Sequence, residues 1–274
     1  MNKKQSYKLS IIIFTSLCLI PLFYLYLLYW EEITQSLAQI EGMWLLTMII
    51  LVRIAFITAM TLYMYHRWFK QEELYLSDIP LLFGSFLLFL IFGKILDLFW
   101  DLTFFSFDEE FVMILLKIRF LIIILEMAPL VYLSINMILY LRSLSGKSTG
   151  DEKQRNKSTF RIMVMIVAIE IIAVILAPNF TIMGILLPFI VIPSIVVIIW
   201  MFLFAYKNKR LSQVHPLIIA IGFIAWLISN IMRPLLQTIF GETTTYVIYA
   251  EIIDFFVFII IFLGFCFKAK YPED

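Results

Sequence analysis

Long apolar runs separated by short polar connections are the main pattern along this chain of 274 residues. A helix needs about 20 apolar residues to cross roughly 30 Å of hydrocarbon at 1.5 Å per residue. Runs of about this length predict eight membrane-spanning helices and therefore an all-α, polytopic transmembrane bundle. The predicted spans are Leu9 to Tyr29, Met43 to Tyr65, Ile79 to Phe104, Phe111 to Leu141, Ile162 to Ala177, Ile182 to Tyr206, Pro216 to Phe240 and Tyr246 to Phe267.

The composition supports the same class of protein. Hydrophobic residues make up 63% of the chain and charged residues only 15%, whereas about a quarter of the residues of a soluble globular domain are charged. The eight spans leave no stretch long enough for a separate soluble domain. We therefore expect residues 1–274 to form a single integral membrane domain, in the plasma membrane of a prokaryote.

Lysine and arginine are confined to alternate connections. Of 21 such residues, sixteen lie before the first span, in every second connection, or after the last span, and the intervening connections hold none. Because basic residues flank spans preferentially on the cytoplasmic side, this bias predicts that both termini are cytoplasmic.

Charged residues also occur inside the predicted spans, where five cations accompany six acidic residues. An unpaired charge at the bilayer centre costs at least about 2.5 to 3.5 kcal/mol, so such residues normally face the bundle interior and pair. Most of them lie roughly 8 to 15 Å below the outer surface, and the inner half of the spans has no charge. We predict a charge network formed by Arg53, Lys94, Asp97, Arg119, Glu126, Glu170, Arg233, Glu251 and Asp254.

Helical spacing places several of these charges on common faces. Lys94 and Asp97 are three residues apart, Arg119 and Glu126 seven apart, and Glu251 and Asp254 three apart, which are separations that share a helix face. One interpretation is that the pairs only fix helix packing. The other is that they line an outward-facing cavity for a small charged or zwitterionic ligand or an ion.

Two stretches of the chain suggest an internal duplication. Pro80 and Pro216 each open a span after a basic connection, and a shift of 136 residues also aligns Asp97 with Arg233. The chain would then be a parallel 4+4 repeat. Its halves would be residues 1–141 and 160–274, joined by a polar cytoplasmic linker at 142–159.

The sequence contains no recognisable catalytic motif. Cys18, Cys266, His66 and His215 stand singly, without the spacing of a metal site. No phosphate-binding glycine loop, nucleophile elbow or HExxH motif is present. We expect no metal, no cofactor and no nucleic-acid partner, and nothing supports an enzyme.

A sensor or receptor and a secondary transporter or channel are the two functional classes that fit. Transporters rely on small residues where helices slide, but the chain has only nine glycines and its inner half is filled with large apolar residues. In broad hydropathy the chain resembles the multi-helix sensor domains that precede bacterial and archaeal kinases. This resemblance implies a sensor that acts through a cytoplasmic signalling partner.

Overall fold

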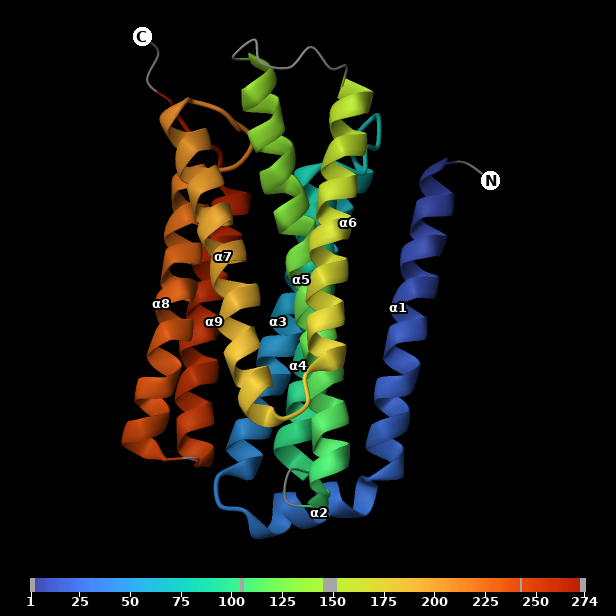
Figure 1. The fold of residues 1–274 in the computed structure, drawn as a ribbon, viewed down its shortest axis with the longest axis vertical. Coiled ribbons are helices and arrows are strands. Elements are labelled where there is room, and N and C mark those ends of the chain that lie inside the picture. The colour runs from blue at the N-terminus through green and yellow to red at the C-terminus, as the bar shows by residue number, and fades with distance from the viewer. Residues whose placement is uncertain (1–2, 104–105, 145–151, 242, 272–274) are drawn as a thin grey trace. The chain divides into compact units, whose positions relative to one another are not determined.

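The computed structural model describes residues 3–103, 106–144, 152–241 and 243–271, and within them all regular structure is helical (Figure 1). Seven helices are long and apolar enough to cross a membrane: α1 (Lys3–Leu28), α3 (Met43–Phe69), α4 (Ile79–Thr103), α6 (Glu152–Leu176), α7 (Phe180–Lys207), α8 (Pro216–Phe240) and α9 (Thr244–Cys266). The prediction of an all-α, multi-pass membrane protein is therefore confirmed.

Two further helices complete the described residues. The long helix α5 (Glu109–Leu144) covers the fourth predicted span. The short helix α2 (Trp30–Gln39) lies in a segment that the sequence analysis treated as a connection (Figure 1). Its sequence is too polar to span a membrane, but Ile33 is buried. Trp30, Ile33 and Leu37 follow an amphipathic helical spacing, but a helix of ten residues is too short to appear as a run of about 20 apolar residues.

The helices around the predicted linker are longer than the apolar runs they contain. Helix α5 continues to Leu144 and α6 begins at Glu152, so much of the predicted linker at 142–159 is helical. Residues 145–151 of that linker lie outside the described residues. No proline or glycine interrupts α6 from Glu152 onward, and polar residues such as lysine and glutamine are good helix formers.

The chain divides into two compact units. Unit 1 runs from Met1 to Pro129 and unit 2 from Leu130 to Asp274, so that the boundary falls within α5. In unit 1, α3 and α4 pack along each other, and α1 and α2 pack against α4. In unit 2, α8 packs against both α7 and α9.

Two glycines allow α8 and α9 to approach closely in unit 2. A Cβ atom built on Gly264 would lie 2.8 Å from the backbone nitrogen of Ile219, and one on Gly222 would lie 3.0 Å from that of Ile261. The contact is reciprocal, because each helix offers a glycine to the backbone of the other. Small residues at such contacts are typical of tightly packed membrane helices.

Candidate functional site

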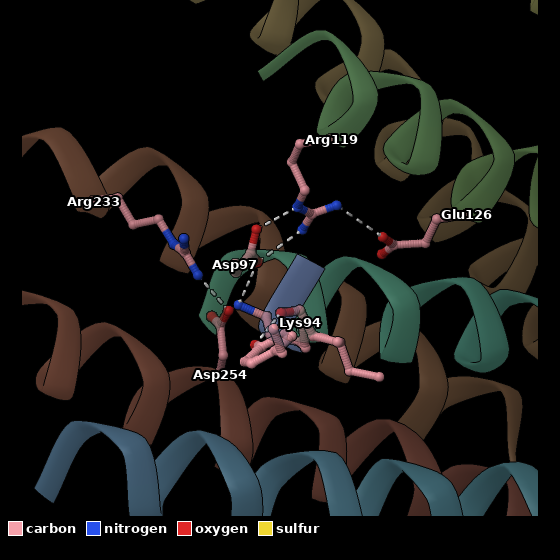
Figure 2. A network of polar contacts seen from close by, with 8 residues as sticks. Lys94, Asp97, Arg119, Glu126, Arg233 and Asp254 are labelled. Carbon is pink, nitrogen blue, oxygen red and sulfur yellow. Dashed lines mark hydrogen bonds and ion pairs between the residues drawn. The ribbon is translucent and has the colours of Figure 1, made fainter. Parts of the chain in front are cut away.

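In unit 1, Asp97 on α4 is held by two cations (Figure 2). Lys94, one turn earlier on the same helix, places its Nζ 3.1 Å from Asp97 Oδ2. Arg119 on α5 donates from Nε to Oδ1 at 2.5 Å and from Nη2 to Oδ2 at 3.1 Å. This two-point geometry is the strongest arrangement available between an arginine and a carboxylate.

The same group of charges extends deeper along α5 to Glu126 (Figure 2). Glu126 Oε2 lies 3.9 Å from Arg119 Nη1, and Glu126 also interacts electrostatically with Lys94 and with Arg53 of α3. Three helices of unit 1 therefore supply one set of charges. We call Arg53, Lys94, Asp97, Arg119 and Glu126 the unit 1 cluster.

Accessibility within the unit 1 cluster is graded. The side chain of Asp97 is 27% exposed and that of Arg119 is 18% exposed, whereas that of Glu126 is 3% exposed. Arg53 and Lys94 are also buried. The Arg119–Asp97 pair is thus the accessible part of the cluster, with buried charges beneath it.

Gly93 on α4 makes room for the Arg119 side chain. A Cβ atom at Gly93 would lie 2.6 Å from Arg119 Nη1 and 2.9 Å from its Cζ. The guanidinium group therefore lies against the helix backbone one residue before Lys94. This role of Gly93 was not predicted from the sequence, although a glycine beside an intramembrane lysine and aspartate was a signal that could have suggested it.

Aromatic side chains flank the cluster. The Tyr26 hydroxyl on α1 donates to the carbonyl oxygen of Ile95 at 2.7 Å, and Tyr26 interacts electrostatically with Asp97 and Asp101. Toward the Thr103 end of α4, Tyr29, Phe99, Phe107 and Phe111 form a chain of ring contacts with centroids 4.6 to 5.9 Å apart. These ring contacts link the residue between α1 and α2 to α4 and α5.

Unit 2 contains a smaller set of charges, on α8 and α9. Asp254 accepts a hydrogen bond from Arg233 Nη2 (Figure 2) and another from Ser229 Oγ at 2.8 Å. Ser229 and Arg233 are one turn apart on α8 and therefore share a face. Asp254 is buried, and so is Glu251 one turn earlier on α9.

The nine predicted site residues do not all belong to these two groups. The unit 1 cluster takes five of them, and Arg233, Glu251 and Asp254 belong to unit 2. Glu170 on α6 is half-buried and has no hydrogen bond or ion pair within the described ranges. The sequence gives its position along the predicted span, but helical spacing did not show which side chains it meets.

Comparisons with protein-family models, with curated proteins and with solved structures find no match to this chain. Among the residues that the structure describes, no three His, Cys, Asp or Glu side chains gather where they could hold a metal ion. The fold and these side chains together define a multi-pass helical membrane protein with ionisable side chains buried inside its helix units.

Proposed function

We propose that the unit 1 cluster binds a small charged or zwitterionic molecule and that the protein is a sensor or receptor that signals through a partner. The observation that carries this proposal is the accessible Arg119–Asp97 pair above buried charges. Such a pair can exchange one of its members for a ligand group, while the buried charges hold the site in place.

The charge balance of the cluster favours an anionic group on the ligand. The cluster has three cations, Arg53, Lys94 and Arg119, against the two carboxylates Asp97 and Glu126. Adding Lys117 and Asp101, the other charges within the predicted spans of unit 1, keeps the excess of one cation. In a medium of low dielectric constant, this excess of positive charge attracts an anionic group such as a carboxylate.

A zwitterion fits the Arg119–Asp97 pair more completely than a simple anion. Its carboxylate would accept the two hydrogen bonds that Arg119 now donates to Asp97, and its ammonium group would pair with the released Asp97 carboxylate. Each member of the pair would then keep a partner of opposite charge, which limits the cost of the exchange. We therefore expect a zwitterion to bind more tightly than an anion, and a simple cation to bind least.

The part of α4 that precedes the cluster supports binding without passage. Phe83, Phe86 and Leu87 are almost completely buried there, so large apolar side chains fill unit 1 between Lys94 and the Ile79 end of α4. A transporter must open on both sides of the membrane. The tightly packed apolar side chains at this end of α4 favour a pocket that opens on one side of the membrane over a path through it.

The proposed topology has eight spans, with both termini and the partner-binding connections in the cytoplasm. Helix α5, the fourth predicted span in chain order, is added to the seven apolar helices to make eight. The basic residues that end α3 and α7, Arg67 and Lys207, then lie on the same cytoplasmic side. The 4+4 duplication is part of the proposal, supported by the equal length of α4 and α8, each of 25 residues with a proline in its first turn.

Binding and flux measurements on the same protein test this function. Purified protein in nanodiscs is titrated with zwitterionic amino acids, organic carboxylates and monovalent cations, and proteoliposomes are assayed for uptake of the same compounds. We expect saturable binding of a zwitterion or a carboxylate, its loss in Arg119→Gln, and no uptake. The control is Lys117→Gln, which removes a cation two residues away on the same helix.

Three outcomes would count against the proposal. If none of the compounds binds, the proposal of a small charged or zwitterionic ligand is wrong. Equal binding by the Arg119→Gln and Lys117→Gln variants would place the ligand site elsewhere. Uptake that Arg119→Gln abolishes would instead make the protein a transporter.

A further inference from the structure

Two separate segments of unit 2 form one basic surface. One segment, at the end of α7, contains Lys207, Lys209 and Arg210. The other, directly after α9, contains Lys268 and Lys270. All five side chains are exposed. No acidic residue occurs between Tyr206 and His215 or between Cys266 and Tyr271. We call these five cations the basic surface.

Hydrogen bonds hold the two segments together. The Ala269 amide donates to the carbonyl oxygen of Val214 at 3.1 Å, and the Tyr271 hydroxyl donates to that of Arg210 at 2.6 Å. The Tyr206 and Tyr271 rings also contact each other, with centroids 6.2 Å apart. The two segments that carry the cations are therefore held beside one another in the folded unit.

Lys209 occupies a position where glycine is usual. Helix α7 ends with the Lys209 amide donating to Tyr206 O at 3.1 Å and the Arg210 amide donating to Ala205 O at 2.8 Å. This pair of bonds is a Schellman motif, whose residue after the helix adopts a left-handed conformation, and Lys209 has φ of 52°. Glycine adopts that conformation without steric cost. The presence of lysine instead of glycine at this position is consistent with a role for the positive charge of Lys209.

The basic surface lies where membrane helices meet lipid headgroups. Helices α7, α8 and α9 contain 28, 25 and 23 residues, which at 1.5 Å per residue gives about 35 to 42 Å, longer than the hydrocarbon thickness of roughly 30 Å. The five cations lie within four residues of the ends of α7 and α9. Exposed Tyr206 and Phe267 next to them are aromatic residues of the kind enriched at this depth.

We propose that the basic surface binds the phosphate groups of anionic phospholipids. Clusters of lysine and arginine directly beyond a membrane span attract anionic headgroups, and here two segments of the fold combine into one such cluster. The proposal requires only that α7 to α9 cross the membrane. It is independent of whether the unit 1 cluster binds a ligand.

The test measures how anionic lipid stabilises the whole protein. The melting temperature in detergent micelles is recorded with added phosphatidylglycerol or phosphatidylcholine, at low and high salt. We expect phosphatidylglycerol to raise the melting temperature more than phosphatidylcholine, and high salt to reduce the difference. The Lys268→Gln/Lys270→Gln double variant should lose about half of the phosphatidylglycerol effect.

Two further variants separate lipid binding from folding. Lys209→Gly removes a charge but relieves the left-handed backbone, so its melting temperature in phosphatidylcholine should not fall, while its response to phosphatidylglycerol should weaken. Arg67→Gln/Lys70→Gln removes two cations at the end of α3 in unit 1 and should leave the response unchanged. Equal losses in both double variants would overturn the proposal. Equal protection by inorganic phosphate at the same phosphorus concentration would also overturn it, because the lipid would then not be recognised.

Discussion

The two charged groups of this protein bury opposite members of their ion pairs. In unit 1 the carboxylate of Asp97 is 27% exposed and the cations Lys94 and Arg53 are buried. In unit 2 the carboxylate of Asp254 is buried and Arg233 is 32% exposed. The exposed member of each pair is the one that another group can replace. Unit 1 thus offers an exchangeable carboxylate, whereas unit 2 offers only an arginine.

The packing around the two charged groups also differs. Asp254 is additionally bound by Ser229, on helices that already touch through Gly222 and Gly264. Its pair with Arg233 therefore adds to a contact that close packing defines. In unit 1, the Arg119–Asp97 pair joins α4 to α5 by two hydrogen bonds. We infer that unit 1 carries the ligand site and that the Arg233–Asp254 pair fixes helix packing.

The largest expected effect on stability comes from Asp97→Ala. This change leaves the buried Lys94 and the adjacent Arg119 without their shared carboxylate, and loss of one partner of a buried pair costs about 3 to 5 kcal/mol. Asp101→Ala, four residues further along α4 and nearer its end, should cost much less. Thermal or denaturant unfolding of both variants in detergent measures the difference, and equal stabilities would contradict the weight given to the pairs of Asp97 with Lys94 and Arg119.

A smaller effect is expected from Arg233→Ala in unit 2. The variant removes the Arg233 hydrogen bond from the buried Asp254 and leaves that from Ser229, which should cost about 2 kcal/mol, the value of a hydrogen bond to a charged group. The double variant Arg233→Met/Asp254→Leu should recover most of the lost stability, because apolar replacement of a whole buried pair is often neutral. Failure of the double variant to recover, as judged from unfolding curves, would argue against a purely packing role.

The close contact between α8 and α9 gives a third prediction. Gly222→Ala would place a Cβ atom against the backbone of Ile261, which cannot move aside as a side chain can. Overpacking of this kind costs about 1 to 3 kcal/mol. Gly184→Ala in α7 is the matched control because nothing lies within 4 Å of its added Cβ atom. That variant should be stabilised by about 0.5 to 1 kcal/mol, and equal unfolding midpoints would contradict the prediction.

The smallest effect on stability, but a clear one on binding, is expected from Gly93→Ala. The added methyl group meets the guanidinium end of Arg119, which can shift, so unfolding should change by less than about 1.5 kcal/mol. Ligand affinity should fall by about tenfold, since one hydrogen bond to a charged group is worth about 1.5 kcal/mol. Titration of this variant beside Gly184→Ala separates the two readouts, and unchanged affinity would show that Arg119 is not positioned by Gly93.

The apolar helices of membrane-spanning length could be predicted from the sequence because a bilayer imposes a fixed apolar length. The depth of the charges in the membrane stays a prediction. Pro216 to Phe240 coincides with α8, and Met43, Ile79 and Thr244 begin helices at or near the predicted residues. The bounds of α5 and α6 were less predictable, because helices continue into polar sequence beyond the hydrocarbon.

The contacts of the charges were not predictable from spacing alone. Helical periodicity gave the shared face of Lys94 and Asp97, but it is blind to which helix packs opposite, so it did not reveal the Arg119–Asp97 pair or the place of Gly93. It also grouped Glu170 with the other charges, although this residue has no partner in the described part of the chain. Which side chains pair across helices depends on tertiary packing.

The most direct test of the account compares ligand affinity in Arg119→Gln and Arg233→Gln with that of the unaltered protein. Each variant removes one arginine from one group, and both are titrated in nanodiscs with the tightest-binding zwitterion or carboxylate. The account predicts that Arg119→Gln weakens binding by more than about tenfold, the equivalent of one charge-assisted hydrogen bond, while Arg233→Gln binds as the unaltered protein does. An equal loss in both variants, or a loss only in Arg233→Gln, would contradict the assignment of the ligand site to unit 1.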